Sequence, residues 1–152
     1  MKALILIALL LCAVPAFAEL PGADLLADVI MKEFDRDHDS RIDANEWREG
    51  TSDGFLEMDT DRDGYITESE VDGLVEPLSE ELGRIGATAA VALIKKILFT
   101  LDTDGDHRVS KTEYDQGCAA FFKLLDTNHD RLITKAELAD LPTRLLTRPD
   151  KK

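Results

Sequence analysis

Four twelve-residue segments of this chain share one pattern, which constrains its fold more than any other feature. Each begins with Asp, carries oxygen-bearing side chains at positions 1, 3, 5 and 9 and ends with Glu, and each has an aliphatic residue at its eighth position. Four such segments in a chain of 152 residues are hard to attribute to chance. We name them loops 1 to 4 in chain order: residues 35–46, 59–70, 102–113 and 126–137.

The oxygen atoms of the loops indicate the ligand. Alternating hard oxygens closed by a carboxylate suit a Ca²⁺ ion, which takes about 6–8 oxygen ligands at about 2.3–2.6 Å. The histidines His38, His107 and His129 also fall inside the loops, but their spacing does not suit a zinc site. We therefore expect solvated turn histidines and calcium sites.

Apolar residues recur every three or four positions beside the loops, as in the run Ala27, Ile30, Met31 and Phe34. This period predicts helices on either side of each loop. The expected fold class is all-α, with four helix–loop–helix units in two closely spaced pairs and short β contacts between loops. The pairs occupy residues 19–78 and 79–152, with a break at Glu76–Ser79, where Ser79 is a plausible N-cap for a helix to about Thr100.

The connectors within each pair are short. Only twelve residues separate loop 1 from loop 2, and twelve separate loop 3 from loop 4. A straight helix of that length spans about 18 Å and would hold its two loops apart. Residues 50–54 contain a good helix breaker, and Gly117 is a weaker one. We favour two short helices in each connector, so that neighbouring loops pair. The alternative is one shared helix, with loops that pair across the two halves.

With these features the chain resembles the EF-hand family of helix–loop–helix calcium proteins, from about Asp24 to Leu145. Its layout is similar to that of small secreted or periplasmic bacterial EF-hand proteins. The resemblance implies calcium ligands at loop positions 1, 3, 5, 7, 9 and 12, with position 7 using its backbone carbonyl. A bidentate Glu at position 12 favours Ca²⁺ over Mg²⁺. The implied ligands are Asp35, Asp37, Asp39, Arg41, Asp43 and Glu46; Asp59, Asp61, Asp63, Tyr65, Thr67 and Glu70; Asp102, Asp104, Asp106, Arg108, Ser110 and Glu113; and Asp126, Asn128, Asp130, Leu132, Thr134 and Glu137.

Position 6 is where the chain departs from the family pattern. The family has Gly there because the backbone turns through a left-handed conformation, and only Gly64 satisfies this. Ser40, His107 and Arg131 bring a β-carbon into that turn, at a cost of about 1–2 kcal/mol each. Loop 4 also has Asn128 in place of a carboxylate. We expect loop 2 to bind most tightly, loop 4 most weakly, and loops 1 and 3 to lie between.

Residues 1–18 have the features of a cleaved signal peptide: Lys2, an apolar run over residues 3–14 and a small-x-small site at residues 16–18. The apolar run is too short to span a bilayer, which takes about 20 apolar residues. We expect a secreted or periplasmic protein without a membrane span, whose mature chain begins at about Glu19.

Charge and composition restrict the function further. The chain has 18 basic and 31 acidic residues and a net charge of −13, which makes nucleic acid a poor partner. Most acidic residues with a notable spacing are inside the loops. The sequence contains no nucleophile with a paired base and no phosphate-binding glycine loop, so we expect that the protein is not an enzyme. Cys118 is the only cysteine after cleavage, and its apolar neighbours predict a buried thiol.

Two calcium functions remain. The first is a buffer or calcium-stabilised module. The alternative is a sensor that exposes an apolar surface and regulates a protein partner, whose identity the sequence does not reveal. Promiscuous sensor grooves are rich in Met. After cleavage only Met31 and Met58 remain, which argues against a promiscuous sensor but not against a sensor with one partner.

Overall fold

The computed structural model describes residues 23–140, and the expected signal peptide lies outside them. The described part is mostly helical with two short antiparallel sheets, which confirms the coarse fold class. Among its helices, none is long and apolar enough to cross a membrane. The elements are α2 (Ala23–Phe34), β1 (Arg41–Asp43), α3 (Ala44–Met58), β2 (Tyr65–Thr67), α4 (Glu68–Asp72), α5 (Val75–Leu98), β3 (Arg108–Ser110), α6 (Lys111–Leu125), β4 (Leu132–Thr134) and α7 (Lys135–Ala139).

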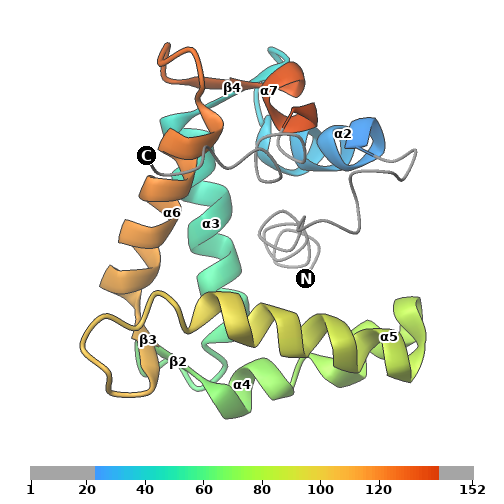
Figure 1. The fold of residues 1–152 in the computed structure, drawn as a ribbon, viewed down its shortest axis with the longest axis vertical. Helices are drawn as coiled ribbons and strands as arrows, with labels where there is room; N and C mark the ends of the chain where they lie inside the picture. The colour runs from blue at the N-terminus through green and yellow to red at the C-terminus, as the bar shows by residue number, and fades with distance from the viewer. Residues whose placement is uncertain (1–22, 141–152) are drawn as a thin grey trace, which may run out of the picture.

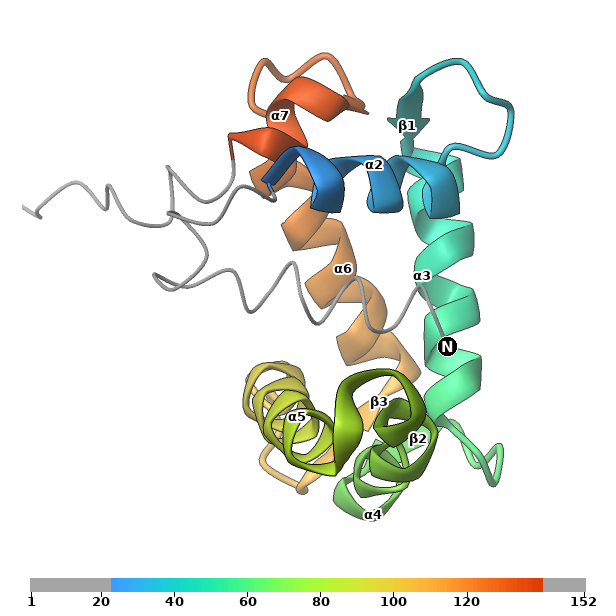
Figure 2. The same cartoon turned by 90° about the vertical axis from the view of Figure 1, so that its right-hand side faces the viewer.

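Each connector is one uninterrupted helix, α3 in the first pair and α6 in the second. The expected bend at residues 50–54 is therefore wrong. The glycines serve close packing instead: a β-carbon on Gly50 would lie 2.6 Å from Cε1 of Phe34, and one on Gly117 would lie 2.5 Å from Cδ2 of Leu101. Figures 1 and 2 show α3 and α6 side by side along the length of the molecule.

The loops pair across the two halves of the chain. Strand β1 of loop 1 pairs antiparallel with β4 of loop 4, and β2 of loop 2 pairs with β3 of loop 3. The favoured expectation of neighbouring pairs is wrong, and the alternative is correct. The physical reason is the straightness of α3 and α6, because a 15-residue helix separates the loops at its ends by about 22 Å.

Two separate cores result, one at each end of α3 and α6. Figure 1 shows the helices and strands that gather at these two ends. We call them the 1/4 lobe and the 2/3 lobe after their loops. The core of the 1/4 lobe contains Ala27, Ile30, Phe34, Ile42, Trp47, Phe122, Leu125, Ile133 and Leu138. The core of the 2/3 lobe contains Phe55, Met58, Ile66, Val71, Leu78, Ala87, Val91, Ile94, Leu98, Val109, Tyr114 and Cys118.

Aromatic residues join α3 to α6 at both ends. In the 1/4 lobe the ring centroids of Trp47 and Phe122 are 6.1 Å apart, and the indole N–H of Trp47 donates to the carbonyl of Cys118 at 2.9 Å. In the 2/3 lobe Phe55 meets the ring of Tyr114 edge to face at 5.3 Å. The thiol of Cys118 is buried, as expected, and burial raises its pKa to about 11.

The long helix α5 begins earlier than expected. It starts at Val75, so Pro77 lies in its first turn, where a missing backbone N–H costs little. Ser79 does not cap the helix; its hydroxyl donates to the carbonyl of Val75. The interruption comes instead at Gly83, whose φ of 68° and ψ of 159° are not helical, and the chain turns sharply there (Figure 1).

Close packing at Gly50 predicts a stability effect. Gly50→Ala should lower the free energy of unfolding by about 1–3 kcal/mol, because the added methyl group overpacks the Phe34 contact. If Gly50 were loosely packed, the same substitution would instead raise the free energy of unfolding by about 1 kcal/mol, because Ala favours a helix more than Gly does. Leu56→Ala, at a residue of α3 that is 59% exposed, is the control and should change stability by less than about 0.5 kcal/mol. Urea unfolding followed by circular dichroism measures both, and a more stable Gly50→Ala variant would contradict the packing argument.

Candidate metal centre

Every loop runs through its short strand directly into a helix, and the same two residues organise each junction. The residue at position 9 caps the helix, since its side chain accepts a hydrogen bond from the backbone N–H of position 12. The glutamate at position 12 accepts one in return from the backbone N–H of position 9, which completes a capping box. The four pairs are Asp43 with Glu46, Thr67 with Glu70, Ser110 with Glu113, and Thr134 with Glu137.

The closing glutamate also reaches back to the start of its loop. Its Oε1 atom accepts the backbone N–H of position 2, at 2.7 Å from Arg36, 2.8 Å from Thr60, 2.7 Å from Thr103 and 2.9 Å from Thr127. Its Oε2 atom accepts the N–H of position 9 at 2.9 Å in all four loops. One carboxylate thus spans the beginning and the end of each loop.

The opening aspartate holds the turn from the other side. Its Oδ2 atom accepts the backbone N–H of position 6, from Ser40, Gly64, His107 and Arg131 at 2.9–3.1 Å. Asp35, Asp59 and Asp126 are buried, and Asp102 is half-buried. The backbone of each loop therefore curls around its own first side chain.

These contacts gather the carboxylates. Among the described residues, three groups bring carboxylate oxygens within 4.8 Å of one another: Asp35, Asp37 and Asp39; Asp59, Asp61 and Glu70; Asp102, Asp104 and Glu113. In loop 4 the amide of Asn128 instead donates to Asp130 at 3.0 Å. Loop 4 therefore presents less negative charge toward its centre.

Hydrogen bonds keep the closing glutamates of loops 2, 3 and 4 ionised. The backbone N–H groups of Thr103 and Ser110, with the two hydroxyls of these residues, lower the pKa of Glu113 to about 2. Burial acts to raise the pKa of Glu70 and of Glu137. In both glutamates the hydrogen bonds from the loop outweigh the effect of burial, so the pKa of each carboxyl group is lowered. These carboxylates are therefore anionic near neutral pH and able to bind a cation.

The left-handed turn expected at position 6 is present in all four loops, with φ values of 70° at Ser40, 87° at Gly64, 62° at His107 and 69° at Arg131. The sequence reasoning missed a second left-handed residue, at position 4. It is His38, Arg62, Gly105 and His129 in loops 1 to 4, with φ between 61° and 78°. Gly105 was the available signal, since only loop 3 has Gly there.

The structure therefore brings together the implied ligands at positions 1, 3 and 5 of loop 1 and at positions 1, 3 and 12 of loops 2 and 3, while among the described residues it forms no such group in loop 4. Positions 7 and 9 lie on the strands, and the oxygens at position 9 are already used as helix caps. The three histidines are exposed, and each occupies a left-handed turn position. An all-oxygen set of clustered anionic and amide ligands fits a hard divalent cation such as Ca²⁺.

Comparisons with known proteins agree with this geometry. The EF hand family model matches residues 26–50 and 52–74, which contain loop 1 and loop 2 respectively. The chain is 31% identical to Calaxin of Xenopus laevis over 110 residues, an alignment that covers 61% of this chain and 51% of Calaxin. The chain thus spans about half the length of that curated relative. Both matches support the EF-hand calcium-binding superfamily.

The capping boxes predict a measurable effect at Ser110. Ser110→Ala should lower the free energy of unfolding by about 0.5–2 kcal/mol, because the N-cap of α6 is lost. Ser110→Thr is the matched control, since loops 2 and 4 use Thr at this position, and it should be nearly neutral. Urea unfolding in the presence of a chelator isolates the cap from metal binding. Equal losses in the two variants would show that the hydroxyl does not act as the cap.

Proposed function

We propose that this chain binds calcium ions through up to four loops and acts as a buffer or calcium-stabilised module. The proposal starts from the likeness to the EF-hand family. The observation that carries the proposal is the repetition of one geometry. In all four loops a closing glutamate joins positions 2 and 9 while the opening aspartate holds position 6. The family model supports this for loops 1 and 2, and the extension to loops 3 and 4 rests on their matching hydrogen bonds.

Charge explains why a cation would stabilise the fold. The chain has a net charge of −13, and its carboxylates are held within 4.8 Å of one another in three groups of the described residues. Like charges at this distance repel, so the metal-free loops oppose their own folded arrangement. Bound Ca²⁺ would offset this repulsion and so stabilise the folded arrangement of the loops. The clustered carboxylates serve cation binding, and none of them serves catalysis.

The distribution of exposed apolar side chains favours a module over a sensor. The exposed large apolar residues of the described part are spread over four helices: Val29 on α2, Leu56 on α3, Ile85 and Leu93 on α5, and Leu124 on α6. A sensor presents a continuous apolar surface to its partner. The other apolar side chains are packed in the two cores.

The location of the protein is part of the proposal. We propose export through a signal peptide at residues 1–18, which leaves a secreted or periplasmic chain. Amino-terminal sequencing of the protein recovered from an exporting host tests this. A first residue near Glu19 is the expected result, and an intact Met1 in the folded, recovered protein would contradict it.

Calcium titration tests the function directly. By calorimetry we expect micromolar or millimolar binding, and Ca²⁺ at about 100 times a site's Kd should add about 2.7 kcal/mol to the free energy of unfolding. Glu70→Gln should remove the tightest site, and Glu137→Gln should remove the weakest. Glu76→Gln, the same change at an exposed residue outside the loops, should alter neither. If calcium gives no heat and no change in stability, the proposed function is wrong.

The left-handed turns predict how to strengthen the weakest loop. Arg131→Gly should raise the calcium affinity of loop 4 about tenfold, because a β-carbon at a φ of 69° costs about 1–2 kcal/mol. Arg131→Ala removes the same charge but keeps the β-carbon, so it should gain much less. Competition with a calcium chelator dye measures both affinities. An equal gain in the two variants would attribute the effect to charge.

A further inference from the structure

We infer that the calcium sites are coupled in the pairs 1 with 4 and 2 with 3, while loops that are neighbours in sequence bind nearly independently. The inference rests on the proposed calcium binding and specifies how that binding is regulated. Loops 1 and 4 lie at opposite ends of the chain, so their coupling follows from the fold and not from sequence distance.

The strand register provides the first argument. In the 1/4 lobe Arg41 is opposite Thr134, and Asp43 is opposite Leu132. In the 2/3 lobe Tyr65 is opposite Ser110, and Thr67 is opposite Arg108. In all four pairs, position 7 of one loop lies opposite position 9 of its partner loop. Both positions are implied calcium ligands. A movement of one strand as its loop closes on an ion therefore moves ligands of the partner loop.

The residues between these ligands make the strand pairs stiff. Ile42 is opposite Ile133, and Ile66 is opposite Val109. All four side chains are 0% exposed. Each pair is packed in the core of its lobe, so the two strands cannot shift independently without disturbing that core.

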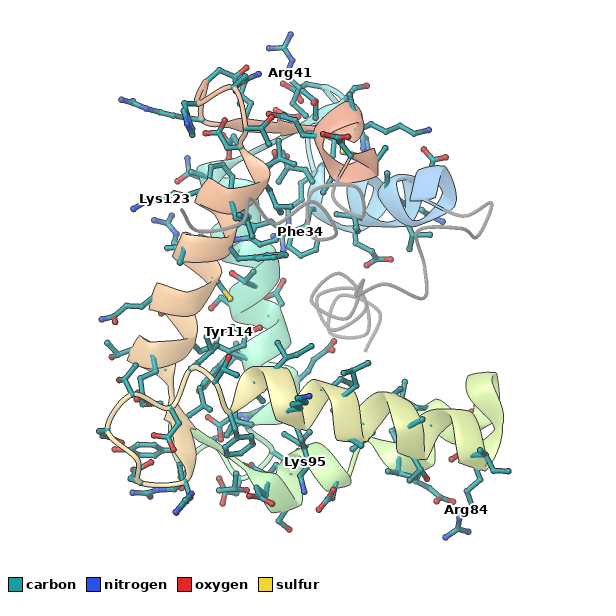
Figure 3. The ribbon with its side chains drawn as sticks, in the orientation of Figure 1. Phe34, Arg41, Arg84, Lys95, Tyr114 and Lys123 are labelled. Atoms are coloured by element: carbon teal, nitrogen blue, oxygen red, sulfur yellow. The ribbon has the colours of Figure 1, made fainter. Side chains whose placement is uncertain are left out.

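The 2/3 lobe has additional links between its loops. The backbone N–H of Lys111, the first residue of α6, donates to the carbonyl of Gly64 at 3.1 Å. This bond joins the left-handed turn of loop 2 to the start of the helix that carries Glu113. The guanidinium of Arg108 also lies over the ring of Tyr65, 4.3 Å from its centroid. Figure 3 shows the two loops together at the end of the molecule near Tyr114.

Loops that are neighbours in sequence have no shared strand pair. Loops 1 and 2 are at opposite ends of α3, and loops 3 and 4 are at opposite ends of α6. Any coupling between them must pass along a 15-residue helix, about 22 Å in length. We therefore expect it to be much weaker than coupling across a strand pair.

Tyr65 offers a probe for one loop. It stands at position 7 of loop 2, so its phenol can sensitise the emission of a terbium ion bound there. Tyr65→Phe should abolish most of this emission because the phenol is lost. Glu70→Gln should abolish it because the metal site is lost. Together the two variants assign the signal to loop 2. Terbium replaces calcium in oxygen sites of this kind, and the titration midpoint then reports the affinity of loop 2.

The test compares two single substitutions outside loop 2. Glu113→Gln in loop 3 should weaken terbium binding by loop 2 at least fivefold, the lower range of ordinary coupling between sites. Glu46→Gln in loop 1 is the matched control and should change it less than twofold. A larger effect from Glu46→Gln, or equal effects, would overturn the inference. Circular dichroism at saturating terbium checks that each variant is folded.

A second measurement covers the case in which Glu113→Gln does not fold. The fluorescence of Trp47, in the core of the 1/4 lobe, should follow calcium binding there, and Trp47 is the only tryptophan. Glu137→Gln should shift its calcium midpoint at least fivefold, and Glu70→Gln less than twofold. Normal binding with no such difference would overturn the coupling and leave the proposed function intact. Absence of any calcium heat in calorimetry would overturn both.

Discussion

The contact between α3 and α6 is the constraint on which the rest of the structure depends. Both helices run straight between two loops, and they lie against each other with a buried indole N–H donating to the carbonyl of Cys118. Because neither helix bends, each loop must find its strand partner on the other helix. The two lobes, their cores and the pairing of the loops follow from this arrangement (Figure 2).

This arrangement makes each lobe depend on both halves of the sequence. The 1/4 lobe takes Phe34 and Trp47 from the first half and Phe122 and Leu125 from the second. The 2/3 lobe is built similarly from Phe55 and the start of α6. Since the core residues of one half are covered by those of the other, neither half can bury its apolar surface alone in this fold. Metal binding at one loop therefore acts on a core that its partner loop shares.

The loops could be predicted from the sequence because their chemistry is local. Spacing alone located the aspartates and glutamates, and the left-handed turn at Ser40 and Arg131 followed from the family pattern. The pairing could not be predicted, because Gly50 is compatible both with a helix break and with close packing against Phe34. Its role depends on a partner distant in sequence. The start of α5 was misplaced for a related reason, since Pro77 suits either the end of one element or the first turn of the next.

The most direct measurement of the central claim is a nuclear Overhauser experiment on the isotope-labelled, calcium-loaded protein. The account predicts cross-strand contacts between Ile42 and Ile133 and between Ile66 and Val109, which are opposite one another in the two sheets. Contacts between Ile42 and Ile66, or between Val109 and Ile133, would show that neighbouring loops pair and would contradict it.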